Sequence, residues 1–247
     1  MSAARLKYLA AGAMAADHIG WLLEPMSPLA GPDDLLFYLF RYIGRLAFPI
    51  FAFFTAEGCR KTRSFPRYLL RLGLFGGATH VFIFLASGGT GGSVIATFFL
   101  AALGIFLCGQ LTVSGRSPVL AFLPGLGLAL LAQALGTDYG FLGAALVLCL
   151  YFCGEDRRRQ LLCLGGFLVL LYLGEPLAAW LSATPGQAPP LFPLYLPHAL
   201  LMTLCACAAL PLLARYDGTR GRGSKWFFYW FYPGHLAALF LLNAIIA

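Results

Sequence analysis

Residues 6–23 of the chain, LKYLAAGAMAADHIGWLL, form an apolar run that holds an acid and a histidine side by side. The run approaches the length of about 20 residues that a helix needs to cross a bilayer. An ionised side chain at membrane depth costs roughly 2.5–3.5 kcal/mol on insertion scales. A chain that keeps Asp17 and His18 in such a run is expected to use them, so our functional interpretation begins with this pair.

The composition of the whole chain is that of a membrane protein. Of its 247 residues, 60% are hydrophobic and 11% are charged, whereas soluble domains carry about 25% charged residues. The first run lacks a small-x-small cleavage site, which favours a retained helix over a cleaved signal peptide. The seven cysteines follow no metal-ligand spacing, and we expect no metal site. The fold class expected is therefore all-α, a polytopic helix bundle.

Nine stretches of the chain are long and apolar enough to be membrane spans. We expect about nine helices in a single domain, residues 1–247, formed by residues 6–23, 35–56, 67–86, 93–112, 118–136, 138–154, 160–179, 195–214 and 226–246.

The distribution of Lys and Arg predicts how the spans are oriented. Cytoplasmic segments of membrane proteins carry an excess of basic residues. With the N-terminus in the cytoplasm and the C-terminus outside, no Lys or Arg falls in an outside segment, and only Arg41 and Arg45 lie within a span. This topology also explains the net charge of +7 without a nucleic-acid partner. The partner expected instead is the lipid bilayer.

Several polar side chains are expected to lie at membrane depth. Lys7 and His18 are 11 residues apart, which is close to three helical turns, so they face the same way about 16 Å apart. Arg41 and Arg45 lie one turn apart on the second span, at depths that bracket His18. All four histidines, His18, His80, His198 and His235, fall within spans or at their outer edge.

Each of these residues also has a purely structural interpretation. Asp17 with Arg41 or Arg45 is either a buried ion pair that fixes helix packing or part of a reactive site. His198 alone suits a hydrogen-bonded packing residue. His18 suits proton transfer because histidine titrates near neutrality. Since neighbours on a helix point in different directions, Asp17 is expected to orient a partner rather than His18 itself.

Two basic segments are candidate binding sites for phosphate groups. Residues 57–71, expected to form a loop, are the densest basic stretch, and residues 215–225 combine basic side chains with glycines. Arg and Lys bind phosphate well. Topology and contact with anionic lipid account for such segments equally well, and residues 215–225 lack the spacing of a P-loop.

Motifs spread over most of the chain carry a family resemblance. They are Leu6-Lys7, Asp17-His18-Ile19-Gly20, the block Ile43–Phe53, Glu57-Gly58 with Thr62, Asp138-Tyr139-Gly140 with Gly143, Tyr216–Gly221, Phe228-Tyr229 and Phe231–Leu236. The stretch from Gly44 to Pro49, Gly-Arg-Leu-Ala-Phe-Pro, is the most specific of these. Together they resemble the TraX family of bacterial membrane proteins, although Asp217 stands where that family has Asn.

The resemblance implies a function. The best-known role of the family is N-terminal acetylation of conjugative pilin, and it is grouped with transmembrane acyltransferases that use cytoplasmic acetyl-CoA. Those proteins often have a basic residue, ten residues and then a histidine in the first helix, a spacing matched by Lys7 and His18. The resemblance therefore implies an acetyltransferase of the bacterial inner membrane whose acceptor is pilin or another membrane peptide.

Site residues are assigned on this basis. The candidate catalytic residues are His18 as base or acyl carrier, Arg45 for the oxyanion or for Asp17, Asp17 itself, and His235 as a second base. The candidate residues for binding acetyl-CoA are Lys7, Arg41, Glu57, Arg60, Lys61, Thr62, Arg220, Lys225, Tyr229 and Tyr232.

Two other classes of function stay open. Acidic, basic and histidine side chains within spans also mark ion pathways, and prolines and glycines in spans suit a proton- or ion-coupled transporter. The two halves of the sequence show no internal repeat, which argues against a transporter. The other alternative is a non-catalytic assembly factor for a membrane peptide, in which Asp17 and Arg45 are only structural.

Overall fold

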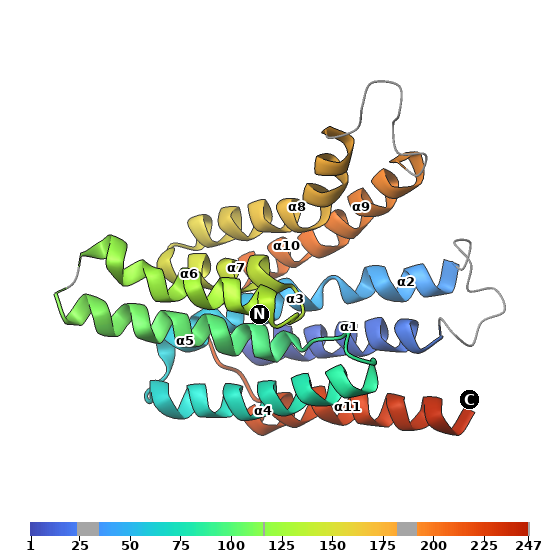
Figure 1. Ribbon diagram of the computed structural model, residues 1–247, viewed down its shortest axis with the longest axis horizontal. Helices are drawn as coiled ribbons and strands as arrows, with labels where there is room; N and C mark the ends of the chain where they lie inside the picture. Colours follow the sequence, from blue (N-terminus) through green and yellow to red (C-terminus); the bar gives the residue numbers. More distant parts are fainter. Residues whose placement is uncertain (24–34, 116, 182–191, 247) are drawn as a thin grey trace. The chain divides into compact units, whose positions relative to one another are not determined.

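The computed structural model describes residues 1–23, 35–115, 117–181 and 192–246, and every regular element in these ranges is a helix (Figure 1). This confirms the all-α prediction. The helices are α1 (Ala3–Leu23), α2 (Leu35–Gly44), α3 (Ala47–Lys61), α4 (Phe65–Ala86), α5 (Val94–Val113), α6 (Pro118–Ala134), α7 (Gly140–Phe152), α8 (Arg157–Leu181), α9 (Phe192–Cys207), α10 (Ala209–Ala214) and α11 (Lys225–Ile246).

Each predicted span overlaps one helix or two successive helices. Within the described ranges, four helical stretches are long and apolar enough to cross a membrane, and α6 and α7 contribute two shorter apolar helices. The four stretches are Phe37–Lys61, Phe65–Ala86, Val94–Val113 and Leu196–Ala214. The protein is thus a multi-pass helical membrane protein, while the count of nine spans and their orientation stay predictions. Glu24, Asp33 and Asp34, which we place outside, lie beyond the described residues.

The second predicted span is wrong as one continuous helix, because the chain turns at Arg45 and Leu46 between α2 and α3. Pro49 explains the interruption. In an unbroken helix the Arg45 carbonyl would accept from residue 49, but proline has no N–H and its ring crowds that carbonyl. The span 195–214 is likewise interrupted, at Ala208 between α9 and α10, where Pro211 has the same effect on the Cys207 carbonyl.

The basic stretch 57–71 is also mostly helical, contrary to its interpretation as a loop. α3 continues to Lys61, and α4 already begins at Phe65. Pro66 in the first turn of α4 suits a helix start, since the N–H groups of that turn have no partner within the helix. Most basic side chains of this stretch therefore project from helices.

The described chain forms two compact units, one of residues 1–51 and 164–247 and the other of residues 52–163. The second unit packs α4, α5, α6 and α7 through glycines. A Cβ at Gly76 would lie 3.0 Å from the backbone of Ile95 and Ala96, and one at Gly104 would lie 3.0 Å from the Gly125 Cα. Small residues allow membrane helices this close an approach. A single domain for residues 1–247 stays a prediction.

In the first unit, α1 and α2 lie side by side and run in opposite directions (Figure 1). Gly20 on α1 meets Phe40 on α2, where an added Cβ would come within 2.8 Å of the Phe40 Cβ. About one turn further along α2, Gly44 lies directly against the Asp17 side chain of α1. These glycines bring the helix backbones together where the charged residues meet.

Helix α11 packs on α1 in the same direction. Tyr8 contacts Phe227 and Phe228 near the start of both helices, and His18 contacts His235 further along. Backbone N–H groups of Ala3 and Ala4 donate to the carbonyls of Thr219 and Arg220, which ties the segment before α11 to the start of α1.

The approach of α1 to α2 predicts a strong effect of Gly44→Ala. The new Cβ would overlap the Asp17 side chain, so the helices must separate or Asp17 must leave its partners, at a cost of about 1–3 kcal/mol. Gly12→Ala on α1 is the matched control, because nothing lies within 4 Å of its Cβ position. Unfolding in detergent measures both variants, and equal midpoints would contradict the close approach.

Candidate functional site

Asp17 on α1 binds two arginines of α2. Its Oδ1 accepts from Arg45 Nη2 at 2.6 Å, and its Oδ2 accepts from Arg41 Nη1 at 3.0 Å. Arg45 Nε also donates to the Arg41 carbonyl at 3.1 Å. The expected pairing of Asp17 with an arginine is therefore present, and it involves both candidates rather than one. We call Asp17, Arg41 and Arg45 the charge cluster.

The charge cluster is largely sheltered from solvent. The exposed fractions of its side chains are 14% for Asp17, 11% for Arg45 and 28% for Arg41. The Arg45 guanidinium also lies over the ring of Tyr172 on α8, with Cζ 6.0 Å from the ring centroid, an arrangement that favours a cation. One carboxylate faces two guanidinium groups, so the cluster has a net charge of +1 and can stabilise a further negative charge.

His18 on α1 forms a pair with His235 on α11. The His18 Nδ1 and the His235 Nε2 are 2.6 Å apart, and the His235 Nδ1 is 2.6 Å from the Phe231 carbonyl oxygen one turn earlier. The buried Tyr232 lies edge-on to both imidazoles, with ring centroids 6.1 Å from His18 and 5.8 Å from His235. Both histidines were sequence candidates, but their direct contact was not predicted.

Two consecutive residues of α1 thus serve two different helices. Asp17 reaches α2, whereas His18 reaches α11. A helix turns by about 100° per residue, which is why neighbours cannot share a partner surface. The expectation that Asp17 supports an arginine rather than His18 is borne out by these contacts.

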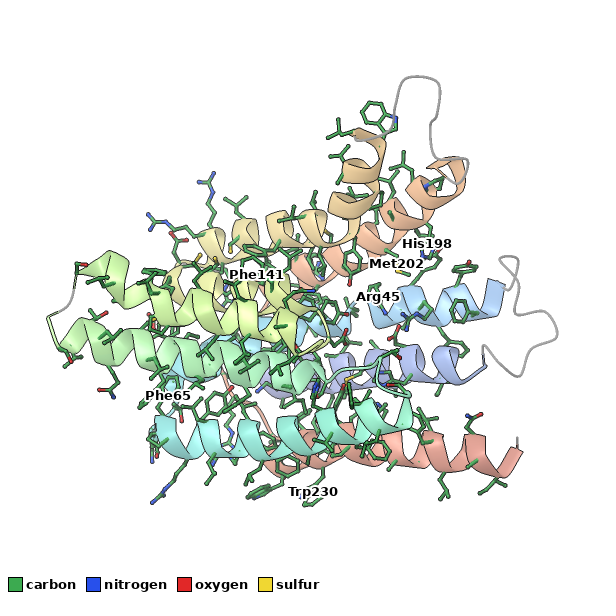
Figure 2. All side chains as sticks on the ribbon, in the orientation of Figure 1. Arg45, Phe65, Phe141, His198, Met202 and Trp230 are labelled. Atoms are coloured by element: carbon green, nitrogen blue, oxygen red, sulfur yellow. The ribbon has the colours of Figure 1, made fainter. Side chains whose placement is uncertain are left out.

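A second polar pair lies beside the charge cluster and was missed by sequence reasoning. The Tyr42 hydroxyl and the His198 Nδ1 are 2.9 Å apart, and the ring of Tyr38 lies 5.1 Å from that of His198. Figure 2 shows Arg45 at the end of α2 and His198 on α9. The signal available was the spacing of Tyr38 and Tyr42, which puts both on one face of the helix that carries the arginines.

The donor-binding candidates of the first unit lie mainly near the starts of α1 and α11. The Lys7 ammonium is 5.9 Å from the centroid of the Phe228 ring. Arg220 is exposed, and its carbonyl holds the Ala4 N–H at 3.0 Å. Tyr229 contacts Trp226, and Tyr232 lies against the histidine pair. The Lys225 side chain is outside the described residues.

The segment before α11 is fixed by Asp217. Its Oδ1 accepts from the Thr219 hydroxyl at 2.6 Å and from the Thr219 N–H at 2.9 Å, and these hydrogen bonds lower the pKa of Asp217 to about 2. The Oδ2 lies 3.3 Å from the amino group of Met1. An Asn carbonyl could accept the same two bonds from Thr219, which explains why either residue suits this position.

The remaining candidates lie on the last turn of α3, in the second unit. The buried Glu57 accepts from Lys61 Nζ at 2.7 Å, and 52% of the Lys61 side chain is exposed. Arg60 Nη1 donates to the carbonyls of Leu150 and Tyr151 at 2.8 and 3.3 Å, so it caps the end of α7. The Thr62 hydroxyl donates to the Ser64 carbonyl at 3.3 Å.

Comparison with known proteins is consistent along the whole chain. A sequence model of the family described as "TraX protein" matches residues 2–243. The chain is also similar to a protein of Dichelobacter nodosus described as "Probable fimbrial assembly protein FimC, serogroup H1". The two are 26% identical over 261 residues, which cover 96% of this chain and 94% of that protein. No solved structure matches the chain significantly.

The charge cluster predicts that Asp17→Asn is strongly destabilising. The substitution leaves two sheltered guanidinium groups without their counter-charge, and breaking a buried ion pair from one side costs about 3–5 kcal/mol. The exposure of Arg41 places the expected loss toward the lower figure. Unfolding in detergent measures it.

The double variant Asp17→Asn with Arg45→Gln is the control. Removing one guanidinium together with the carboxylate should recover part of the lost stability, which a double-mutant cycle isolates. Strictly additive losses would show that Asp17 and Arg45 are not coupled.

Proposed function

The chain belongs to the TraX family, and we propose that it is a membrane-embedded acyltransferase of the bacterial inner membrane. In this proposal the acyl donor is cytoplasmic acetyl-CoA, and the acceptor is the N-terminal amine of a membrane peptide. The observation that carries the proposal is His18, which is hydrogen-bonded to His235 and directly follows Asp17 of the charge cluster of net charge +1. A base and a site for negative charge are what transfer to an amine requires.

The acceptor class follows from the relatives. The D. nodosus protein is described as a probable fimbrial assembly protein, and pilin acetylation is the best-known role of the TraX family. A fimbrial or pilin subunit with a free N-terminal amine is therefore the acceptor proposed here. Such an amine has a pKa of about 8, so a base must remove a proton for it to attack efficiently.

The donor is proposed to enter at the starts of α1 and α11. Lys7 and Arg220 supply positive charge for its phosphates. The N–H groups of Ala3 and Ala4 at the start of α1 already donate to carbonyls of the segment before α11, so side chains rather than the helix N-terminus must carry the binding. Because α1 is continuous from Ala3 to Leu23, Lys7 and His18 are separated by about 16 Å along its axis. An extended pantetheine arm spans a distance of this order.

At the His18 end of this path, we assign the chemical roles to residues on two faces of α1. His18 accepts the proton of the attacking amine. Arg45 stabilises the negative oxygen of the tetrahedral intermediate, while Asp17 holds the two guanidinium groups in place. The role of Asp17 is then positional, and Arg45 is the member of the cluster that contacts the reacting oxygen.

A proton-coupled transporter is the second candidate, and the interruption of the helix at Arg45 and Leu46 favours it. In membrane transporters, interrupted helices often form the binding sites for ions or substrates. Binding of CoA separates the two candidates. CoA should raise the unfolding temperature of an acyltransferase, because a ligand at a hundredfold excess over Kd adds about 2.7 kcal/mol to the free energy of unfolding. It should leave the unfolding temperature of a transporter unchanged.

His18→Ala is predicted to abolish most transfer. Loss of a general base lowers rates by about 10²–10⁴-fold, while CoA binding should persist. The assay follows labelled acetyl-CoA in proteoliposomes with a pilin-type peptide as acceptor. His80→Gln, a histidine change in the second unit that keeps an acceptor for the Ser93 N–H, is the control. Undiminished transfer by the His18 variant would remove His18 from the mechanism.

Lys7→Gln is predicted to weaken CoA binding with little effect on fold. Loss of one charge-assisted contact to phosphate corresponds to about a tenfold higher Kd or more. Lys61→Gln on α3 is the matched comparison, because Lys61 is exposed and already paired with Glu57. If only Lys61→Gln raised the Kd, the donor would bind at α3, and the proposed path along α1 would be wrong.

A further inference from the structure

We infer that His235 is a positioning residue that sets the tautomer of His18 and receives its proton in a two-histidine relay. The inference rests on the proposed acyl transfer for its purpose, although the tautomer itself can be tested without any reaction. It assigns Nε2 of His18 as the atom that takes the proton from the acceptor amine.

The Phe231 carbonyl oxygen lies 2.6 Å from the His235 Nδ1. A carbonyl oxygen can only accept a hydrogen bond, so this nitrogen must carry the proton. A neutral imidazole has one N–H and one lone pair. The Nε2 of a neutral His235 is therefore an acceptor.

The acceptor state of the His235 Nε2 determines the tautomer of His18. Its Nδ1 lies 2.6 Å from the His235 Nε2, and because that atom accepts, the His18 Nδ1 must donate. In the neutral pair the proton of His18 is thus on Nδ1, and its lone pair is on Nε2. Free histidine has no such fixed assignment, since the partner of one ring nitrogen decides the state of the other.

The ring geometry supports a hydrogen bond rather than stacking. The two imidazoles are inclined by only 19°, with centroids 4.9 Å apart, which is close to the largest separation that a contact of 2.6 Å between ring nitrogens allows. The rings therefore meet edge to edge. Phe231 stacks on His235 with ring centroids 4.8 Å apart, and the buried Tyr232 lies edge-on to both histidines, so neither ring turns freely.

The relay follows from this arrangement. As the amine nitrogen bonds to the acyl carbon, its proton moves to the His18 Nε2. The proton on His18 Nδ1 then crosses to the His235 Nε2, so the positive charge comes to lie on His235. That cation donates to Phe231 through Nδ1 and to His18 through Nε2. When the carbon–sulfur bond of the thioester breaks, the relay reverses and the leaving thiolate takes the proton.

Spectroscopy tests the tautomer directly. In protein labelled with ¹⁵N-histidine and held in micelles, long-range proton–nitrogen correlations distinguish Nδ1–H from Nε2–H rings. His80→Gln and His198→Gln identify the signals of the other two histidines. We expect neutral His18 to be the Nδ1–H form, and a neutral Nε2–H form would overturn the inference. Because no substrate is present, this result is independent of whether acyl transfer occurs.

Two substitutions of His235 test the relay. In His235→Gln the amide carbonyl can still accept from the His18 Nδ1–H, whereas in His235→Leu it cannot. We expect the leucine variant to lose the fixed tautomer and roughly 10²-fold or more in transfer rate, by analogy with enzymes whose base has the wrong tautomer. The glutamine variant should keep the tautomer and recover at least about tenfold of that loss.

The outcomes separate the inference from the proposed function. Transfer that needs His18 but is equally fast in His235→Leu and wild type would contradict the relay and leave acyl transfer standing. Equal loss in the leucine and glutamine variants, with the tautomer intact in the latter, would contradict the positioning role of His235, and a glutamine variant as fast as wild type would contradict its receipt of the proton. A wild-type protein with the expected tautomer and no transfer would sink the proposed function instead.

Discussion

The first unit depends on the ion pairs of the Asp17 carboxylate. This carboxylate binds both Arg45 and Arg41 of α2, and Gly44 allows the two backbones to meet there without a side chain between them. Charges at membrane depth are tolerated when they are paired and hydrogen-bonded. By holding α2 against one face of α1, Asp17 leaves the next residue, His18, directed to α11. An ion cluster and the proposed base therefore involve adjacent residues of a single helix.

The interruption of the helix after α2 also affects the charge cluster. Pro49 removes the donor for the Arg45 carbonyl, and the chain turns at the residue that carries the most sheltered guanidinium of the cluster. A continuous helix would keep the Arg45 backbone in a regular ladder. The turn instead lets the Arg45 side chain, the proposed oxyanion partner, be held by three contacts: Asp17, the Arg41 carbonyl and the Tyr172 ring.

Much of this arrangement could be predicted from the sequence, for identifiable reasons. Length and hydropathy predict the helices, the cost of burying charge directs attention to Asp17 and His18, and the angle between neighbours predicts that Asp17 pairs with an arginine. The His18–His235 and Tyr42–His198 contacts could not be predicted, because hydropathy does not specify which helices are neighbours. The turn at Arg45 was missed because prolines are common in membrane helices and only backbone geometry tells a kink from an end.

We propose that acetyl-CoA binds at the start of α1 and that the acetyl group leaves near His18, further across the membrane. The most direct measurement seals labelled acetyl-CoA inside vesicles in which the protein has one known orientation, with the acceptor peptide outside. We expect acetylation of the peptide N-terminus when the donor is on the face that holds Lys7, and none when it is on the other face. Transfer from the opposite face, or only with donor and acceptor on the same side, would contradict it.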